Sequence, residues 1–181
     1  MADPCLDDAI AQFRKLKSLA EGALAQVPEA RWFEAPAPEA NSIALVMKHL
    51  SGNMRSRWTR FLESDGEKPD RDRDSEFEER AGDDAASIRA RWDAGWTLLF
   101  DTLGALGPGD MARAVTVRGE PHSVREAIHR QMTHYAYHVG QIVLLARLRA
   151  GASWKSLSIP KGKSKEYEVA KDGSRYRPGG R

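Results

Sequence analysis

The chain has 181 residues, of which 41% are hydrophobic and 30% are charged, a composition typical of one soluble globular domain. A single cysteine excludes both a disulfide framework and a cysteine-based zinc site. The net charge of +2 is too small to indicate a nucleic-acid partner, and no apolar run approaches the ~18 residues that cross a membrane.

A first amphipathic helix is expected close to the start of the chain. Apolar residues recur at intervals of three or four from Leu6 to Val27, which places them on one face. Asp3 can accept hydrogen bonds from the first free N–H groups, and Pro4 suits the first turn. Pro28 ends the helix because it cannot continue the backbone hydrogen-bond ladder.

A second helix and a long polar linker follow a connector rich in proline and alanine at 28–40. The apolar spacing predicts this helix over 41–66, with Asn41 as its cap. The linker at 67–82 is dense in charge and has almost no apolar side chains. About 16 extended residues reach ~50 Å, whereas a helix of about 24 residues is ~36 Å long. The linker can therefore cross back along the whole length of a bundle.

Two further helices are predicted in the second half of the chain, with an extended piece between them. The third helix begins near Asp83 or Asp84 and ends within 104–107. Residues 114–117 alternate in the manner of a strand. Three tryptophans are assigned to the core: Trp58, Trp92 and Trp96.

The fourth helix has the clearest boundaries. Ser123 and Glu126 have the spacing of a capping box, in which each side chain satisfies the other's free N–H. The helix is expected to run to about Ala150, with Gly151 as its stop. Four long amphipathic helices in a domain of this size predict an all-α four-helix bundle.

Three of the five histidines can be placed on helix faces that meet. His134 and His138 are four residues apart, so their imidazoles lie one turn apart on one face of the fourth helix. His49 lies at or beside the apolar face of the second helix. Three neutral imidazoles would leave positions open around a metal ion, as in catalytic sites. The alternative is that they are core histidines bonded to tyrosine or to the backbone.

Seven segments together carry a resemblance to a known superfamily. They are residues 41–44, 48–58, 65–69, 74–77, 117–120, 131–143 and 157–160. Through them, and over nearly all of 5–160, the chain resembles the DinB-like (YfiT-related) superfamily of metal-binding four-helix bundles, in a bacterial branch with no assigned reaction. The resemblance implies a long crossover between helices two and three. It also implies a divalent metal ion held by His49, His134 and His138.

The resemblance further implies a metal-dependent hydrolase or a transferase that uses a low-molecular-weight thiol, acting on a small molecule. Zinc or nickel is the expected ion, with iron or manganese as alternatives, since imidazole suits several metals. No residue in the sequence can be identified as the catalytic base. The alternative functions are a non-catalytic metal-binding or interaction module that can form a homodimer, and a nucleic-acid binder that acts through the C-terminal tail.

Charge is unevenly distributed between the body of the protein and its end. Eight basic and three acidic residues in 151–181 give +5, so the remaining 150 residues carry −3. We expect a bundle domain over 1–160, with 154–160 docked on it, and a basic, mobile tail over 161–181. This tail lacks the interleaved aromatic residues of a nucleic-acid module. With no basic and apolar leader at the start, a cytoplasmic protein is expected.

Other charged residues are assigned structural roles. Arg55, Arg57 and Arg60 are interpreted as ion-pair partners of acidic residues on neighbouring helices rather than as ligands of an anion. The alternating acidic residues of 70–74 are interpreted as a solvated loop. A calcium-binding EF-hand would need glycine where Ser75 stands.

Overall fold

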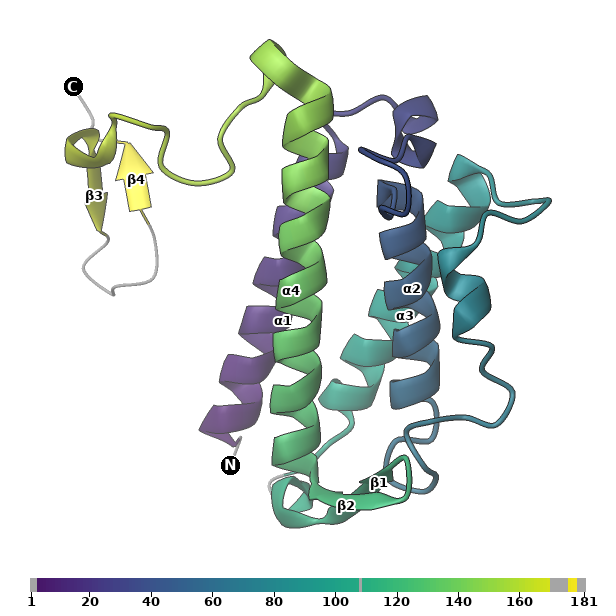
Figure 1. Ribbon diagram of the computed structural model, residues 1–181. Coiled ribbons are helices and arrows are strands. Elements are labelled where there is room, and N and C mark those ends of the chain that lie inside the picture. The colour runs from purple at the N-terminus through teal and green to yellow at the C-terminus, as the bar shows by residue number, and fades with distance from the viewer. Residues whose placement is uncertain (1–2, 108, 170–175, 179–181) are drawn as a thin grey trace.

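The computed structural model of the protein describes residues 3–107, 109–169 and 176–178, and four long helices form a bundle in that part of the chain (Figure 1). They are α1 (Pro4–Leu24), α2 (Ile43–Trp58), α3 (Ala85–Gly104) and α4 (Val124–Ala150). The predicted all-α four-helix bundle is confirmed. None of the helices described is long and apolar enough to cross a membrane.

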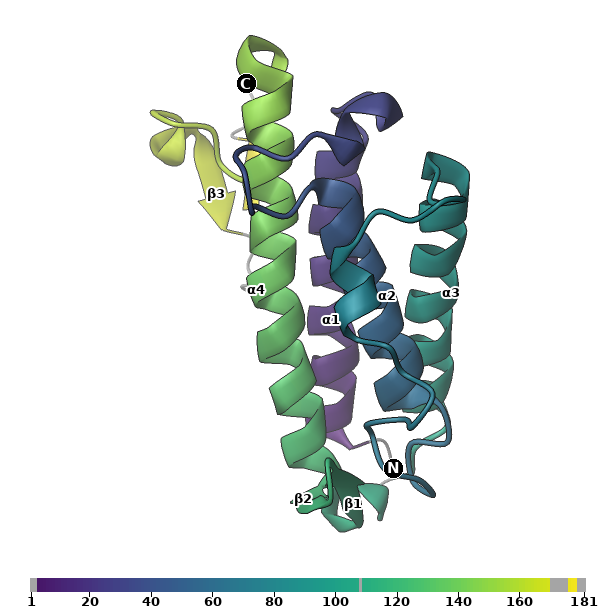
Figure 2. The ribbon, with the colours of Figure 1, turned by 45° about the vertical axis from the view of Figure 1, so that its right-hand side comes forward.

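Helices α2 and α3 run in the same direction, opposite to α1 and α4 (Figure 1). Near their N-terminal ends Lys48 pairs with Asp83, and near their C-terminal ends Thr102 donates a hydrogen bond to the carbonyl of Trp58. The segment 59–84 therefore carries the chain back along the bundle, which confirms the predicted crossover. Within the crossover, the short 3-10 helix η2 (Asp74–Phe77) lies beside α2 (Figure 2).

The predicted boundaries of α2 are wrong at both ends. The capping residue is Ser42, not Asn41, because the Ser42 hydroxyl accepts a hydrogen bond from the N–H of Leu45. The helix ends at Trp58, eight residues before the predicted Gly66. Gly66 instead donates its N–H to the carbonyl of Thr116, and its own carbonyl accepts from Ser56. The segment after α2 is therefore held by long-range backbone hydrogen bonds that local periodicity does not show.

The other helix starts follow the local signals. Asp3 accepts from two backbone N–H groups at the start of α1, and Asp84 forms a capping box at the start of α3. The predicted box of Ser123 and Glu126 is present at the start of α4. Gly151 follows α4 with φ +55°, a conformation that glycine adopts without strain.

A small antiparallel hairpin closes the end of the bundle where α1 and α4 begin (Figure 1). It consists of β1 (Ala114–Val117) and β2 (Glu120–Ser123), as the alternation in 114–117 predicted. Its turn residues Arg118 and Gly119 both have positive φ and donate their N–H groups to the Asp65 carboxylate. This carboxylate ties the crossover to the hairpin.

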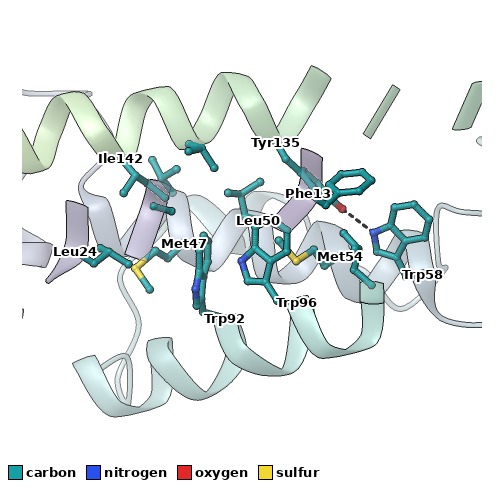
Figure 3. Close-up of a cluster of buried hydrophobic side chains, with 14 of the residues drawn as sticks. Phe13, Leu24, Met47, Leu50, Met54, Trp58, Trp92, Trp96, Tyr135 and Ile142 are labelled. Carbon is teal, nitrogen blue, oxygen red and sulfur yellow. Dashed lines mark hydrogen bonds between the residues drawn. The ribbon is translucent and has the colours of Figure 1, made fainter. Parts of the chain in front are cut away.

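The core contains the three predicted tryptophans, each at most 1% exposed (Figure 3). Trp58 Nε1–H donates to the Tyr135 hydroxyl, which donates in turn to Asn53 Oδ1. These hydrogen bonds link α2 to α4 inside the bundle. Tyr135 directly follows His134 in the sequence. Burial raises the pKa of Tyr135, so its hydroxyl stays protonated and available as a donor.

The segment after α4 packs back on the bundle, as predicted for 154–160. The backbone N–H and carbonyl of Lys155 both bond the Gln26 side chain, and the Leu157 side chain occupies the space beside Gly22 that a Cβ would meet. The remaining short elements are η1 (Glu29–Phe33), η3 (Asp110–Ala112), η4 (Gly151–Ser153), η5 (Ser164–Glu166), β3 (Tyr167–Val169) and β4 (Tyr176–Pro178). Strands β3 and β4 pair antiparallel. The expected mobility of 161–181 stays a prediction, since 170–175 and 179–181 lie outside the described residues.

Candidate metal centre

Three histidines from two helices converge on one point inside the bundle. His49 comes from α2, whereas His134 and His138 come from successive turns of α4. Nε2 of His134 lies 3.3 Å from Nε2 of His49 and 3.1 Å from Nε2 of His138. One ring nitrogen of each lies within 4.8 Å of the other two. The structure thus brings together the three residues that the sequence singled out.

The separations between these nitrogens fit the space around a small divalent cation. Imidazole nitrogens lie about 2.1 Å from zinc, so neighbouring ligand atoms are about 3.0 Å apart in octahedral and about 3.4 Å apart in tetrahedral coordination. Both separations measured at His134 lie within that range. His49 and His138 are buried and His134 is half-buried, so the group faces the bundle interior.

A carboxylate from the crossover orients the first histidine. Glu76 of η2 accepts a hydrogen bond from Nδ1 of His49 at 2.8 Å. Arg71 donates to both Glu76 oxygens at 2.8 Å, and the side chains of Arg71 and Glu76 are 2% and 8% exposed. Phe77 stacks on the other side, with its ring centroid 4.6 Å from that of His49. Carboxylates in this position fix the ring orientation of metal-binding histidines.

No arrangement of protons satisfies all the nitrogens of the cluster. Glu76 and Gln141 offer acceptor oxygens to Nδ1 of His49 and Nδ1 of His138, so these nitrogens carry the protons. The Nε2 lone pairs of both rings then point at Nε2 of His134. One proton on that atom must serve two acceptors, whereas a proton on Nδ1 of His134 has no hydrogen-bond partner in its buried position. A cation at the point of convergence would accept all three lone pairs. The proton of His134 would then lie on Nδ1, which has no hydrogen-bond partner among the described residues.

The surroundings of the cluster favour the neutral forms of His134 and His138 and the ionised form of Glu76. Burial, together with the positive charges of His138 and His49 when protonated, lowers the pKa of His134 to about 3. Burial also lowers the pKa of His138, against the effect of its bond with Gln141. Burial raises the pKa of Glu76, but hydrogen bonds from His49 and Arg71 outweigh it, so the net shift is downward. At neutral pH, His134 and His138 are therefore unprotonated and able to bind a cation.

A cavity of about 480 Å³ opens beside the histidines and is lined in part by His49 and His134. Its volume lies in the range of small-molecule sites, about 300–1,000 Å³. Five arginines also line it, and no acidic residue does. They are Arg57, Arg71, Arg73, Arg118 and Arg130.

Arg55, Arg57 and Arg60 form ion pairs, as predicted, but the predicted location of their partners is wrong. Arg55 pairs with Asp70, Arg57 with Glu67 and Arg60 with Glu63. These partners lie in the crossover rather than on neighbouring helices. Arg57 also lines the cavity, so one arginine interpreted as purely structural belongs to the site as well.

The sequence patterns did not indicate a role for Glu76 or Arg71 at this site. Both lie in a linker whose charges indicate only a solvated loop, yet their side chains are almost fully buried. One local signal was present in α2. Gly52 lies in the middle of the helix, where glycine is unfavourable, and a Cβ at this position would collide with the Glu76 carboxylate. The glycine leaves room for the residue that holds His49.

Comparison with known proteins identifies a family. No curated protein matches the chain. The family described as "Protein of unknown function (DUF1572)" matches residues 1–163, which include all four helices, the crossover and the three histidines. Because the match covers far more than half of the chain, the protein belongs to the DUF1572 family.

Proposed function

We propose that the protein holds a divalent metal ion between His49, His134 and His138. On this proposal it is an enzyme of the DinB-like superfamily that acts on a small molecule as a hydrolase or small-thiol transferase. The observation that carries the proposal is the convergence of three Nε2 atoms, with Nε2 of His134 facing Nε2 of both His49 and His138. Zinc and nickel suit three imidazole ligands, and iron and manganese are alternatives.

The residues around the histidines fit such an ion. The acceptor oxygens of Glu76 and Gln141 hold the outer nitrogens of His49 and His138, which leaves the inner nitrogens free to bind. Three neutral ligands leave the charge of the ion uncompensated and one or more positions open, as in catalytic zinc sites. Zinc bound in this way would favour the deprotonated form of water or a thiol near neutral pH.

The neighbouring cavity favours a reaction over simple metal storage. A structural zinc site is closed by four protein ligands, whereas this one has three candidate ligands, two of which line an open cavity. The chain's own part in such a reaction would be to orient His49 through Glu76 and to position a substrate against the arginines. Asn53 and Thr133, which also line the cavity, can bind polar substrate groups.

Metal titration tests the site. The protein, stripped with chelator and dialysed, is titrated with zinc and with nickel in competition with a chromophoric chelator, and elemental analysis gives the stoichiometry. We expect about one ion per chain, and at least about a hundredfold weaker binding for His134→Ala. His129→Ala is the matched control, because His129 lies on the same helix and is exposed. Equal affinity in wild type and His134→Ala would refute the site.

A second measurement tests the reaction. The loaded protein is assayed with ester and amide substrates, and with electrophiles in the presence of low-molecular-weight thiols. Turnover that is lost in His134→Ala but retained in His129→Ala would support the enzyme. Stoichiometric metal without turnover on any of these substrates would instead assign the chain as a non-catalytic metal-binding module.

A further inference from the structure

The five arginines of the cavity come from four separate parts of the chain. Arg57 lies on α2, Arg71 and Arg73 in the crossover, Arg118 in the hairpin turn and Arg130 on α4. The residues before 151 carry a net charge of −3, so this concentration of positive charge runs against the charge of the body. Folding has gathered arginines that are far apart in sequence around one space.

Only part of this charge is neutralised within the protein. Glu67 pairs with Arg57, Arg71 and Arg118, and the second carboxylate, Glu76, pairs with Arg71. These two carboxylates thus pair with three of the five guanidinium groups. Such an excess of positive charge favours the binding of an anion, because an anion would reduce the repulsion between the guanidinium groups.

The positive charges of the two remaining arginines, Arg73 and Arg130, are the least neutralised by acidic residues. Arg130 is exposed and makes no hydrogen bond or ion pair with any residue that the structure describes. Arg73 lies 3.9 Å from Asp74, whose side chain is 93% exposed, and its guanidinium stands 5.1 Å from the ring centroid of Phe77. Since Phe77 also stacks on His49, this places Arg73 beside the histidine cluster.

We infer that the cavity binds the anionic groups of a small substrate with two or more carboxylate or phosphate groups. Guanidinium groups bind both anions through paired hydrogen bonds, and the cavity volume suits a molecule of that size. The inference deepens the proposed function, because it names the class of molecule that the histidine centre would act on. Arg73 and Arg130 would provide the main contacts, and Arg118 would close the cavity from the hairpin.

Anion binding can be measured without metal, so the two proposals can fail separately. Metal-free protein is titrated calorimetrically with inorganic phosphate and with malonate at constant ionic strength, and with acetate and chloride for comparison. We expect phosphate or malonate, or both, to bind at least about tenfold more tightly than acetate. The tighter of the two identifies the anionic group. Metal-free protein is used because malonate and phosphate would themselves bind a metal ion.

Two matched variants locate the site of binding. Arg130→Gln is expected to weaken the binding of the preferred anion by about tenfold or more, since it removes a charge-assisted contact. Arg125→Gln, an exposed arginine on the same helix that does not line the cavity, is expected to leave binding unchanged. The inference is overturned if neither anion binds better than acetate, or if both variants weaken binding equally. If the protein binds anions but has no affinity for metal ions, the proposed function is refuted and the inference of anion binding stands.

Discussion

Glu76 connects the histidine cluster to the rest of the fold. Its carboxylate joins Nδ1 of His49 to the buried guanidinium of Arg71, and it packs against the backbone of Gly52. Because each of these contacts is short and buried, the orientation of His49 depends on a residue 27 positions away in sequence. A single change of charge at Glu76 should therefore affect the histidine cluster.

Glu76→Gln is expected to weaken zinc binding by about 10–100-fold, because a neutral amide holds the imidazole less firmly and makes it a poorer ligand. Competition titration measures the affinity. Glu78→Gln is the control, since Glu78 lies in the same loop with an exposed side chain that pairs only with Arg80 among the described residues. Unchanged affinity in Glu76→Gln would show that this carboxylate does not support the site.

The buried Tyr135 hydroxyl forms two hydrogen bonds to side chains of α2. Tyr135→Phe removes the hydroxyl that accepts from Trp58 and donates to Asn53. Because it leaves a buried indole N–H without a partner, we expect the free energy of unfolding to fall by about 1–3 kcal/mol. Urea denaturation measures it. Tyr137→Phe, at a neighbouring position that is 65% exposed, should change stability little; equal losses in the two variants would contradict the prediction.

At the scale of elements, α2 and the crossover form one unit. The helix carries His49, and η2 lies against it through Glu76 and Phe77. The close approach of the two requires glycine at position 52, where any side chain would meet the Glu76 carboxylate. The helix thus gives up local stability so that the crossover can reach the histidine.

Gly52→Ala should therefore lower stability and weaken zinc binding, although alanine is the better helix former by about 1 kcal/mol. The new methyl group would push Glu76 away from His49. Gly140→Ala is the matched control in α4, where a Cβ meets nothing within 4 Å, and it should stabilise the protein by up to about 1 kcal/mol. Urea denaturation and metal titration of both variants test this, and a stabilised Gly52→Ala with full affinity would exclude it.

The link between the crossover and the hairpin depends on pH. Burial raises the pKa of Asp65, but N–H donors including those of Glu67, Gly119 and Arg118 outweigh this and lower it to about 2, from 3.8. The folded state therefore prefers the ionised carboxylate. The stability gained is fully present above about pH 4 and is lost as the pH falls towards 2.

Asp65→Asn is expected to destabilise the protein at pH 6 by about 1 kcal/mol or more, because an amide cannot accept all of these hydrogen bonds. The difference from wild type should shrink as the pH falls from about 4 towards 2, where the wild-type carboxyl group is also protonated. Urea denaturation across this pH range measures the difference. If the difference in stability stays constant with pH, the loss comes from the shape of the asparagine side chain rather than from removal of the Asp65 charge.

For the whole molecule, the histidine cluster lies between the two oppositely directed helix pairs. His49 belongs to α2, which runs with α3, and the other two histidines belong to α4, which runs with α1 (Figure 1). An ion held by all three would link the two pairs across the bundle. Binding that requires this folded arrangement must stabilise it.

Zinc at about one hundred times its dissociation constant is accordingly expected to raise the free energy of unfolding by about 2.7 kcal/mol. Thermal unfolding with and without zinc measures the effect, with magnesium as the control ion, because magnesium prefers oxygen ligands. His134→Ala should show no zinc-dependent stabilisation. Equal stabilisation of this variant and the wild type would place the ion elsewhere.

Features that depend on residues close together in the chain can be predicted from the sequence alone. The starts of α1, α3 and α4 follow from side chains that cap the helix within three residues, at Asp3, Asp84 and Ser123. The shared face of His134 and His138 follows from the helical repeat. The length of the linker was enough to allow a crossover, and hence two parallel helices in the middle of the chain.

Three features emerge only on folding: where α2 ends, which carboxylate holds His49 and which arginines share the cavity. Each depends on contacts between segments distant in sequence, such as Gly66 with Thr116 and His49 with Glu76. A charged linker has the same composition whether its side chains point into water or into the bundle. The path of the crossover over α2 settles that choice, because it buries Arg71 and Glu76 against the histidines.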